Sequence, residues 1–297
     1  MHSNDELEAI AARLEESGDY RVIRRLKERD LFRADDGTQK RIGLILDSET
    51  TGLDPARDEI IELAMLKFEY GSDGTIYRVL DQFARLREPT VIIPIEITKL
   101  TGITGEMVAG KIITQEEVEH FASSAAVVIA HNAAFDRRFV ERAFPVFNTK
   151  PWACSMSQVD WEQEGFDGAK LGYLLGGCGL FHDGHRADED CRALLEILAR
   201  PLPSTGVGAL KRLLDTARKP TMRVWAENAP FDFKDILKAR GYRWNDGSDA
   251  RPRSWWKDLH PDVLGEELAF LRADIFQYDA DIPVRRVTAV DRFSDRA

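Results

Sequence analysis

A short apolar segment that ends in two acidic residues constrains this chain more than any other part of its sequence. Residues 42–46 form an apolar run typical of a buried strand, and Asp47 and Glu49 follow ahead of a Thr-Gly turn. Because residues two apart on a strand point to the same face, both carboxylates would project side by side. Their repulsion would raise the pKa of each, and a divalent cation that prefers oxygen ligands would relieve it. Taken alone, the segment also fits a strand that runs into an acidic, solvated turn.

A second apolar run, residues 127–130, leads into an amphipathic helix. Asn132 and Asp136 lie where the expected strand passes into this helix, whose apolar positions include Phe135 and Phe139. A purely structural interpretation makes Asn132 a helix cap and Asp136 a first-turn carboxylate that favours the helix dipole. A functional interpretation makes Asp136 a further ligand for the same cation.

A third segment places His185 five residues before Asp190, at the start of a helix rich in Leu and Ile. Alone, the pattern His-x-Ala-x-x-Asp is more typical of a surface loop and a helix start than of an active site. His182, Asp188 and Glu189 lie close by in the sequence, but they do not fit the pattern that the three segments form together.

In this order, the motifs Asp-x-Glu, Asn-x-x-Phe-Asp and His-x-Ala-x-x-Asp resemble those of the DEDDh (DnaQ-like) 3′→5′ exonucleases, which include polymerase proofreading exonucleases. The resemblance covers about residues 36–200 and implies an α/β, ribonuclease H-like fold, in which helices flank a mixed sheet. Residues 59–64 resemble its second strand, and residues 97–104 resemble the loop that contacts the terminal nucleotide of the substrate. At Cys154 and Ser155 the chain departs from many relatives, which carry Asp-Thr there.

The resemblance also implies a role for each motif residue, in a site that binds two Mg²⁺ or Mn²⁺ ions and hydrolyses phosphodiester bonds. Asp47 would bridge the ions. Glu49 and Asp190 would hold the ion beside the nucleophile, and Asp136 would hold the other. His185 would be the general base, because its unperturbed pKa lies near working pH. The residues expected to contact the substrate are Thr50, Thr51, Gly52, Leu53, Leu100, Thr101, Asn132 and Phe135.

A role for His185 as a metal ligand is the competing interpretation. It is disfavoured because no second His or Cys joins this residue at a spacing typical of zinc sites.

Composition limits the remaining possibilities. With 297 residues, 43% of them hydrophobic, the chain can bury a sizeable core in one or two domains. No apolar run approaches the length of a membrane span, and the N-terminus lacks a hydrophobic signal core, so neither a membrane association nor secretion is expected. Cys154, Cys178 and Cys191 form no paired spacing, which indicates reduced thiols and a cytoplasmic location. The net charge of −10 argues against a protein that coats nucleic acid, but not against an enzyme that binds one strand end.

The pattern along the chain divides it into three parts. In residues 1–35, periodic apolar positions with a break at residues 17–19 predict a helical hairpin, with Gly18 near the end of its first helix. The second helix is basic, as a solvated face or a phosphate-contacting surface would be. Residues 36–205 form the expected exonuclease domain, and the breaker-rich segment 200–206 marks a linker.

Residues 206–297 form a small α+β module that the exonuclease motifs do not explain. Its sequence is similar to that of a small α/β module appended to some DNA-processing proteins. Aromatic residues interleaved with Arg and Lys are typical of surfaces that bind single strands, but Trp244 and Trp255 fit a small core equally well. Because adjacent strand positions face opposite ways, only one of Trp255 and Trp256 can point into that core.

These observations predict a metal-dependent 3′→5′ exonuclease that acts on single-stranded 3′ ends, of DNA rather than RNA, and releases nucleoside 5′-monophosphates. Its role would lie in DNA repair, replication (proofreading) or processing. The alternative enzyme is an exoribonuclease that trims RNA 3′ ends, because these residues do not show whether the pocket rejects a 2′-hydroxyl. An alternative of another class is a non-catalytic nucleic-acid-binding module, against which the complete set of four carboxylates and a histidine argues.

Overall fold

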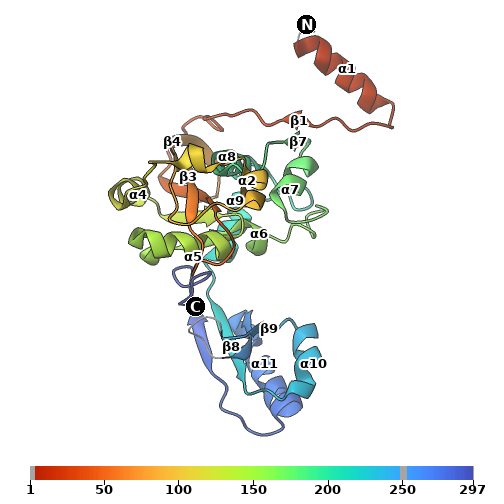
Figure 1. The fold of residues 1–297 in the computed structure, drawn as a ribbon. Helices are drawn as coiled ribbons and strands as arrows, with labels where there is room; N and C mark the ends of the chain where they lie inside the picture. Colours follow the sequence, from red (N-terminus) through yellow and green to blue (C-terminus); the bar gives the residue numbers. More distant parts are fainter. Residues whose placement is uncertain (1–3, 248–252, 297) are drawn as a thin grey trace.

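The computed structural model describes residues 4–247 and 253–296, which form two units with separate hydrophobic cores (Figure 1). The larger unit is built on a five-stranded sheet with the strand order β4-β3-β2-β5-β6. Its strands are β2 (Lys40–Thr50), β3 (Ile60–Gly71), β4 (Ile76–Leu86), β5 (Val127–Ala130) and β6 (Trp152–Cys154). The first three pair antiparallel, whereas β5 runs parallel to both β2 and β6. The predicted mixed sheet is therefore confirmed.

Alternating side chains of β2 pack into two hydrophobic layers, one on each face of the sheet. Leu44 and Leu46 pack on the face covered by α4 (Gln115–Ala122) and α5 (Ala133–Ala143). Ile45 packs on the other face, which is covered by α7 (Leu171–Gly177), α8 (Ala187–Leu198) and α9 (Ala209–Ala217). Because side chains alternate along a strand, Asp47 and Glu49 belong to the face of Ile45 and point toward α8.

Short helices make up much of the connections in the larger unit. They are α2 (Ile95–Thr101), α3 (Gly105–Val108), the 3-10 helix η1 (Pro145–Thr149) and α6 (Ser155–Gln158). No helix in residues 4–247 and 253–296 combines the length and the apolar character that crossing a membrane requires.

The N-terminal segment forms one helix, not the predicted hairpin. The helix α1 (Asn4–Glu16) is followed by Gly18, whose φ of +80° suits glycine at this position. The second predicted helix is wrong. From residue 20 the chain is extended, and β1 (Arg24–Arg25) pairs in parallel with β7 (Leu180–Phe181) of the larger unit.

Ion pairs explain why this basic segment does not form a helix. Arg25 contacts Asp183 at 2.8 Å, and Arg29 contacts the buried Glu196 of α8 at 2.9 Å. An extended backbone lets these arginines reach carboxylates spread along the larger unit, and strand pairing with β7 satisfies its amide groups. The two arginines are therefore partly exposed side chains that pair with acids of the larger unit from an extended segment, and they do not form one face of a helix.

The smaller unit is a four-stranded antiparallel sheet with helices on one face. The strand order is β11-β8-β10-β9. The strands are β8 (Thr221–Glu227), β9 (Arg243–Asn245), β10 (Ser254–Leu259) and β11 (Val284–Val287). The helical elements are η2 (Phe231–Phe233), α10 (Lys234–Ala239), η3 (Pro261–Val263), α11 (Leu264–Phe270) and the π-helix η4 (Leu271–Phe276). Leu237, Leu271 and Ile275 pack with Val224 and Ala226 to form its core.

The boundary between the units lies later than the sequence indicated. Leu210 and Leu213 of α9 are fully buried in the hydrophobic layer that also contains Ile45, so α9 belongs to the larger unit. The predicted boundary at residue 206 preceded this helix because the proline-rich segment before it looked like a linker. That segment is instead a turn, in which Leu202 is buried and Glu164 accepts hydrogen bonds from Ser204 and Thr205.

After β11 the chain returns to the larger unit. In this C-terminal tail (288–296), the carbonyl oxygen of Ala289 accepts a 2.7 Å hydrogen bond from the amide of Trp152 at the start of β6. The fully buried Arg137 of α5 donates to the carbonyl oxygens of Val290 and Arg292. The smaller unit is therefore attached to the larger one at both of its ends.

We predict that Leu213→Ala lowers the free energy of unfolding by about 2–5 kcal/mol, because it leaves a cavity in a closely packed layer. Denaturant unfolding measures this change. Lys211→Ala alters an exposed position of the same helix and should change stability by less than about 0.5 kcal/mol. Equal stability of the two variants would contradict the assignment of α9 to the larger core.

Candidate active site

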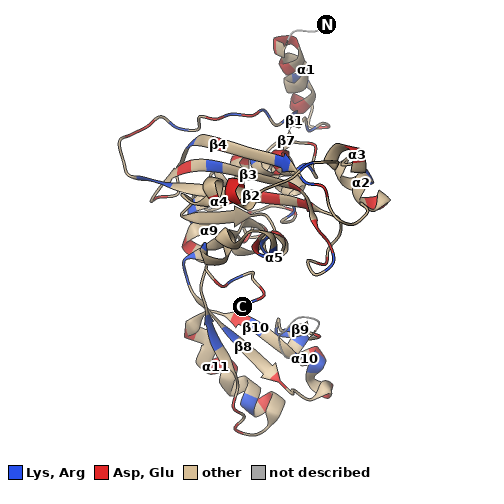
Figure 2. Cartoon of the chain, turned by 60° about the vertical axis from the view of Figure 1, so that its left-hand side comes forward, with Lys and Arg blue, Asp and Glu red and all other residues tan. Residues whose placement is uncertain are grey.

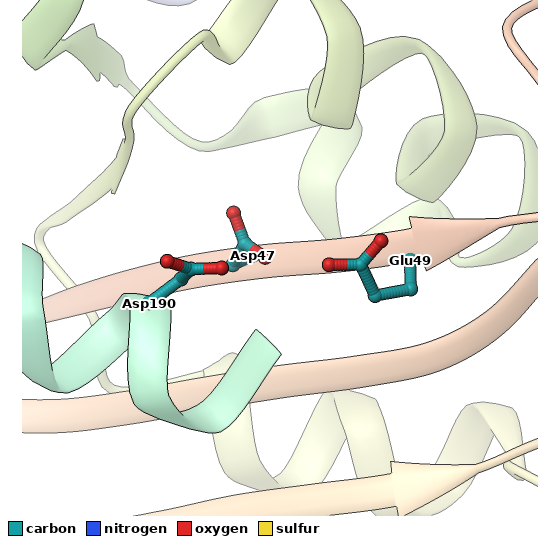
Figure 3. A group of neighbouring side chains, drawn as sticks. All are labelled: Asp47, Glu49 and Asp190. Carbon is teal, nitrogen blue, oxygen red and sulfur yellow. The ribbon is translucent and has the colours of Figure 1, made fainter. Parts of the chain in front are cut away.

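Three of the four predicted carboxylates converge at the end of β2. Asp47 and Glu49 project from β2 and Asp190 projects from the first turns of α8 (Figure 3). One carboxylate oxygen from each lies within 4.8 Å of the other two. Asp47 and Glu49 thus lie side by side, as expected for residues two apart on a strand. Asp190, which is 141 positions after Glu49 in the sequence, completes the cluster.

The fourth carboxylate, Asp136, approaches from the opposite face of the sheet. It is buried on α5, and its Oδ1 accepts hydrogen bonds from the amide of Ser48 at 3.1 Å and from the Ser48 hydroxyl at 2.8 Å. Ser48 lies between Asp47 and Glu49, so it points to the α5 face. Asp136 is thus fixed to the backbone of the strand segment that carries the other two acids, but it stands outside the three-residue cluster.

Burial and mutual repulsion raise the pKa values of these acids. Burial raises the pKa of Asp47 well above its usual value, and the charges of Asp136 and Asp190 add to the effect. Burial also raises the pKa of Glu49 to about 8, with further contributions from Asp190 and Glu62. For Asp136, burial raises the pKa to about 7 against the opposing effect of the Ser48 hydrogen bonds.

A fifth acid, Glu62 of β3, anchors the start of α8. It is buried and accepts hydrogen bonds from the Arg186 guanidinium at 3.1 Å and from the amide of Ala187 at 3.1 Å. The first amides of a helix lack partners within the helix, so a carboxylate here fixes both its start and its direction. Glu62 therefore determines where Asp190, three residues into α8, meets β2.

Two histidines lie beside Asp190 and contact it in different ways. His185 is exposed, has a φ of +66°, and donates its backbone amide to Asp190 Oδ2 at 2.9 Å. His182 Nε2 lies 2.5 Å from Asp190 Oδ1, and its side chain is largely buried. The side chain of the predicted base is thus free to turn toward a substrate, while the histidine outside the sequence pattern holds the carboxylate.

The residues predicted to contact substrate fall into two groups. Leu53 and Leu100 are 81% and 51% exposed, and Asn132 is also exposed. Thr50 and Thr51 are buried, and their hydroxyls bind Gly52 and Asp58 within the turn after β2. These two threonines therefore shape the turn from inside.

Gly52 is needed in the same turn for a steric reason. A Cβ at this position would lie 2.5 Å from the Asp58 carboxylate.

The segment predicted as a substrate loop is largely helical. Residues 95–101 form α2, which ends at Gly102 with a φ of +73°. Thr101 is buried, and its hydroxyl donates to the carbonyl oxygen of Ile97 and accepts from the amide of Ile103. Only Leu100 of the two predicted contacts here therefore presents its side chain to solvent.

The start of α5 shows a strained residue at the end of a buried strand. Asn132 occupies the N-cap position of α5, as the structural interpretation expected, but it has a φ of 146° and its side chain makes no capping bond. Phe135 is half-buried and packs on Phe139, with ring centroids 4.9 Å apart. The preceding His131 binds Ser155 through Nδ1 at 2.8 Å, so Ser155, where the sequence departs from many relatives, has a partner in the site wall.

The site contains residues that the motifs did not reveal: Ser48, Glu62, His131 and His182. Ser48 could have been found from its place between the two acids, because strand alternation directs it to the α5 face. Glu62 and His131 act through contacts with Ala187 and Ser155 on other elements, which no local pattern reports. His182 lies only eight residues before Asp190, but it falls outside the spacing of the motif.

Comparisons with known proteins identify the family to which this arrangement belongs. The exonuclease family model matches residues 44–198, just over half of the chain, so the chain is a member of this exonuclease family. The predicted DEDDh-type resemblance and the class of phosphodiester hydrolase are thereby confirmed.

Individual relatives are similar over the same share of the chain. The DNA polymerase III epsilon subunit of Treponema pallidum is 31% identical over 160 residues, which cover 51% of this chain and 72% of that subunit. The PolC-type DNA polymerase III of Thermotoga maritima is 30% identical over 195 residues, 58% of this chain and 13% of that polymerase. The 3′-5′ exonuclease DinG of Bacillus subtilis is 32% identical over 184 residues, 57% of this chain and 19% of that protein. The chain thus spans a small part of the length of the last two.

We predict that the metal-free protein loses stability as the pH rises from about 4.5 to about 8. In this range the folded state keeps a proton on Glu49 that the unfolded state has released. The folded state therefore binds more protons, and the free energy of unfolding falls as pH rises. Thermal unfolding in a chelating buffer measures the slope.

Glu49→Gln provides the control, because it removes this titration and should reduce the slope, to which Asp47 and Asp136 also contribute. Added Mg²⁺ should raise the midpoint most at the high end of the range, where the acids are charged. A wild-type midpoint that rises from pH 5 to 8 in chelator would contradict the repulsion described here.

Proposed function

We propose that this protein is a metal-dependent 3′→5′ exonuclease that removes nucleoside 5′-monophosphates from DNA. The observation that carries the proposal is the cluster of Asp47, Glu49 and Asp190, with Asp136 held beside it by Ser48. Burial and the charges of neighbouring acids raise the pKa of both Asp47 and Glu49, and for Glu49 the charge of Arg186 offsets part of this effect. Such a set of oxygen donors fits a hard divalent cation, and we propose Mg²⁺ or Mn²⁺.

Asp47, Glu49 and Asp190 would hold the metal, and Asp136 would hold a second ion from the α5 side. Divalent cations at such sites lower the pKa of bound water and neutralise charge on the phosphate and on the departing oxygen. The chain's own contribution is rigidity. Ser48 fixes Asp136, and Glu62 fixes the start of α8, so the carboxylates are positioned before substrate arrives.

His185 is the proposed general base. Its imidazole is exposed beside Asp190, and its backbone amide is tied to that carboxylate. The side chain can therefore take a proton from an attacking water close to the metal-binding acids. Leu53, Leu100 and Asn132 present exposed side chains and are proposed to contact the terminal nucleotide.

The direction and the substrate follow from relatives. One similar protein is named a 3′-5′ exonuclease, and two others are named as parts of DNA polymerase III. These names support 3′→5′ hydrolysis and DNA as the substrate, in repair, replication or processing. Oligonucleotides of DNA and RNA with labelled 5′ ends test both points, because 3′→5′ degradation shortens the labelled strand stepwise.

We predict that Asp47→Asn abolishes nuclease activity and leaves the protein folded. The substitution keeps the side-chain volume and removes the charge needed to hold the metal. Gel analysis of the labelled oligonucleotides measures activity, and circular dichroism checks the fold. Chelator should abolish wild-type activity, and Mg²⁺ or Mn²⁺ should restore it. Full activity in excess chelator would rule out the proposed metal-dependent mechanism.

We predict that His185→Ala lowers turnover by about two to four orders of magnitude, the usual contribution of general acid–base catalysis. Mg²⁺ affinity, measured by calorimetry, should change little, because His185 contacts Asp190 through its backbone amide, which the substitution keeps. His182→Ala is the matched comparison, since it removes a direct contact with Asp190 and should weaken Mg²⁺ binding. If His182→Ala instead lowered turnover without changing Mg²⁺ affinity, and His185→Ala weakened Mg²⁺ binding, His182 would be assigned as the base.

A further inference from the structure

A cleft of about 490 Å³ lies between the two units and is separate from the carboxylate cluster. One wall consists of Ala134 and Arg138 of α5 together with the end of α6. The opposite wall is the smaller sheet, and the C-terminal tail closes one end of the cleft. Figure 1 shows α5 on the side of the larger unit that faces the smaller one.

The sheet wall of the cleft is the face without helices. Strand pairing places Trp256 opposite Trp225 on one side and opposite Arg243 on the other, so these three side chains share a face. Trp255 and Trp244 belong to the other face, where Trp255 packs into the core formed with α10 and α11. Of the two adjacent tryptophans, Trp255 therefore serves the core and Trp256 faces the cleft.

Trp256 is flanked by two guanidinium groups. The Arg223 guanidinium lies 4.2 Å from the centroid of its ring system, and that of Arg243 lies 5.5 Å away. Arg223 is also held by a bidentate ion pair with Asp258, with both N–O distances 2.7 Å. Arg223 is the basic position of the neighbouring β8, which Figure 2 shows in the smaller unit.

The cleft is basic within a chain of net charge −10. Five cationic side chains line it against two carboxylates: Arg138, Lys219, Arg223, Arg243 and Arg292 against Asp258 and Asp295. The carboxylates are paired with Arg223 and Arg138. Arg292 is buried and donates to the carbonyl oxygens of Ala217 and Lys219. Lys219 and Arg243 are exposed and, in residues 4–247 and 253–296, pair with no carboxylate.

We propose that this cleft binds a single-stranded stretch of the nucleic acid whose 3′ end is in the active site. This inference rests on the proposed function. Exposed cations that lack carboxylate partners attract phosphates, and a face built of a tryptophan ring and guanidinium planes offers stacking surfaces for unpaired bases. A duplex keeps its base faces within its own stack, so the pairing of Trp256 with arginines favours a single strand.

The position of the cleft supports this path. Ala134 and Arg138 lie two residues before and after the buried Asp136, so they face the cleft from the opposite side of the same helix, one helix diameter from the carboxylates, roughly 10 Å. A strand that leaves the carboxylates and passes the start of α5 therefore reaches the cleft. The smaller unit would then bind nucleotides upstream of the cleaved bond, so the affinity for the nucleic acid should depend on its length.

The experiment uses full-length protein carrying Asp47→Asn, so that the strand is not degraded, and a fluorescein-labelled thymidine 30-mer. In fluorescence anisotropy, Lys219→Glu with Arg243→Glu should weaken binding at least tenfold and reduce the slope of log affinity against log salt by about 1.4. The matched control is Lys238→Glu with Arg286→Glu, which reverses the same charge at exposed positions away from the cleft. It should change affinity less than twofold.

A second pair of variants tests stacking separately from charge. Trp256→Leu should weaken binding about tenfold or more. Trp244→Leu, an exposed tryptophan on the other face of the same sheet, should have little effect. Circular dichroism checks that all variants fold.

Activity with an intact Asp47 separates this inference from the proposed function. The cleft double variant should lower the ratio of degradation rates for a 30-mer over a 4-mer, whereas the control double variant should leave the ratio unchanged. The inference is overturned if both cleft variants bind the 30-mer with wild-type affinity, if the control variants lose as much affinity as the cleft variants, or if binding of duplex DNA weakens as much as binding of the single strand. Degradation of the 4-mer would in that case still support the nuclease activity. A wild-type chain that degrades neither oligonucleotide would instead overturn the proposed function, and the anisotropy result would still decide on the cleft.

Discussion

Repulsion among the carboxylates at the end of β2 is the interaction on which the rest of the structure depends. Burial and neighbouring charges raise the pKa of Asp47 and Glu49, so the folded state keeps these groups together against their electrostatic preference. Neutral or oppositely charged side chains next to the acids hold the carboxylates in place against this repulsion. Ser48 donates to Asp136, and Arg186 pairs with Glu62, which fixes the helix that carries Asp190. A site strained in this way is ready to bind a cation without rearrangement.

The larger unit and its acids could be predicted from the sequence because local patterns encode them. The apolar runs 42–46 and 127–130 become the central strands β2 and β5, and strand alternation alone brings Asp47 and Glu49 to one face. The convergence with Asp190 was implied by family resemblance, since no physical rule of spacing links residues so far apart. The role of Glu62 cannot be predicted from the sequence, because it depends on contact with the start of α8 and not on neighbouring residues in the chain.

The failures have a common physical origin in long-range contacts. The apolar periodicity of residues 20–32 favours a helix, but pairing with β7 and ion pairs to distant acids such as Glu196 stabilise an extended chain instead. The proline-rich segment before α9 looked like a linker, although Glu164 binds two of its amides and holds it as a turn. The role of Trp256 was open because alternation shows that two adjacent tryptophans face opposite ways, but not which face the helices cover.

The return of the chain to the larger unit has a mechanical consequence. The smaller unit is entered through β8 and left through β11, and these two strands are hydrogen-bonded neighbours. Both attachments therefore lie along one margin of the sheet, and β9 forms the unattached margin at the other side. Any rotation of the smaller unit about these two attached strands would displace β9 farthest. The exposed Arg243 is on that edge, whereas Lys219 lies beside the attachment at the start of β8. A small rotation about β8 and β11 would therefore change the distance between these two cations and with it the spacing of phosphates that the cleft accepts.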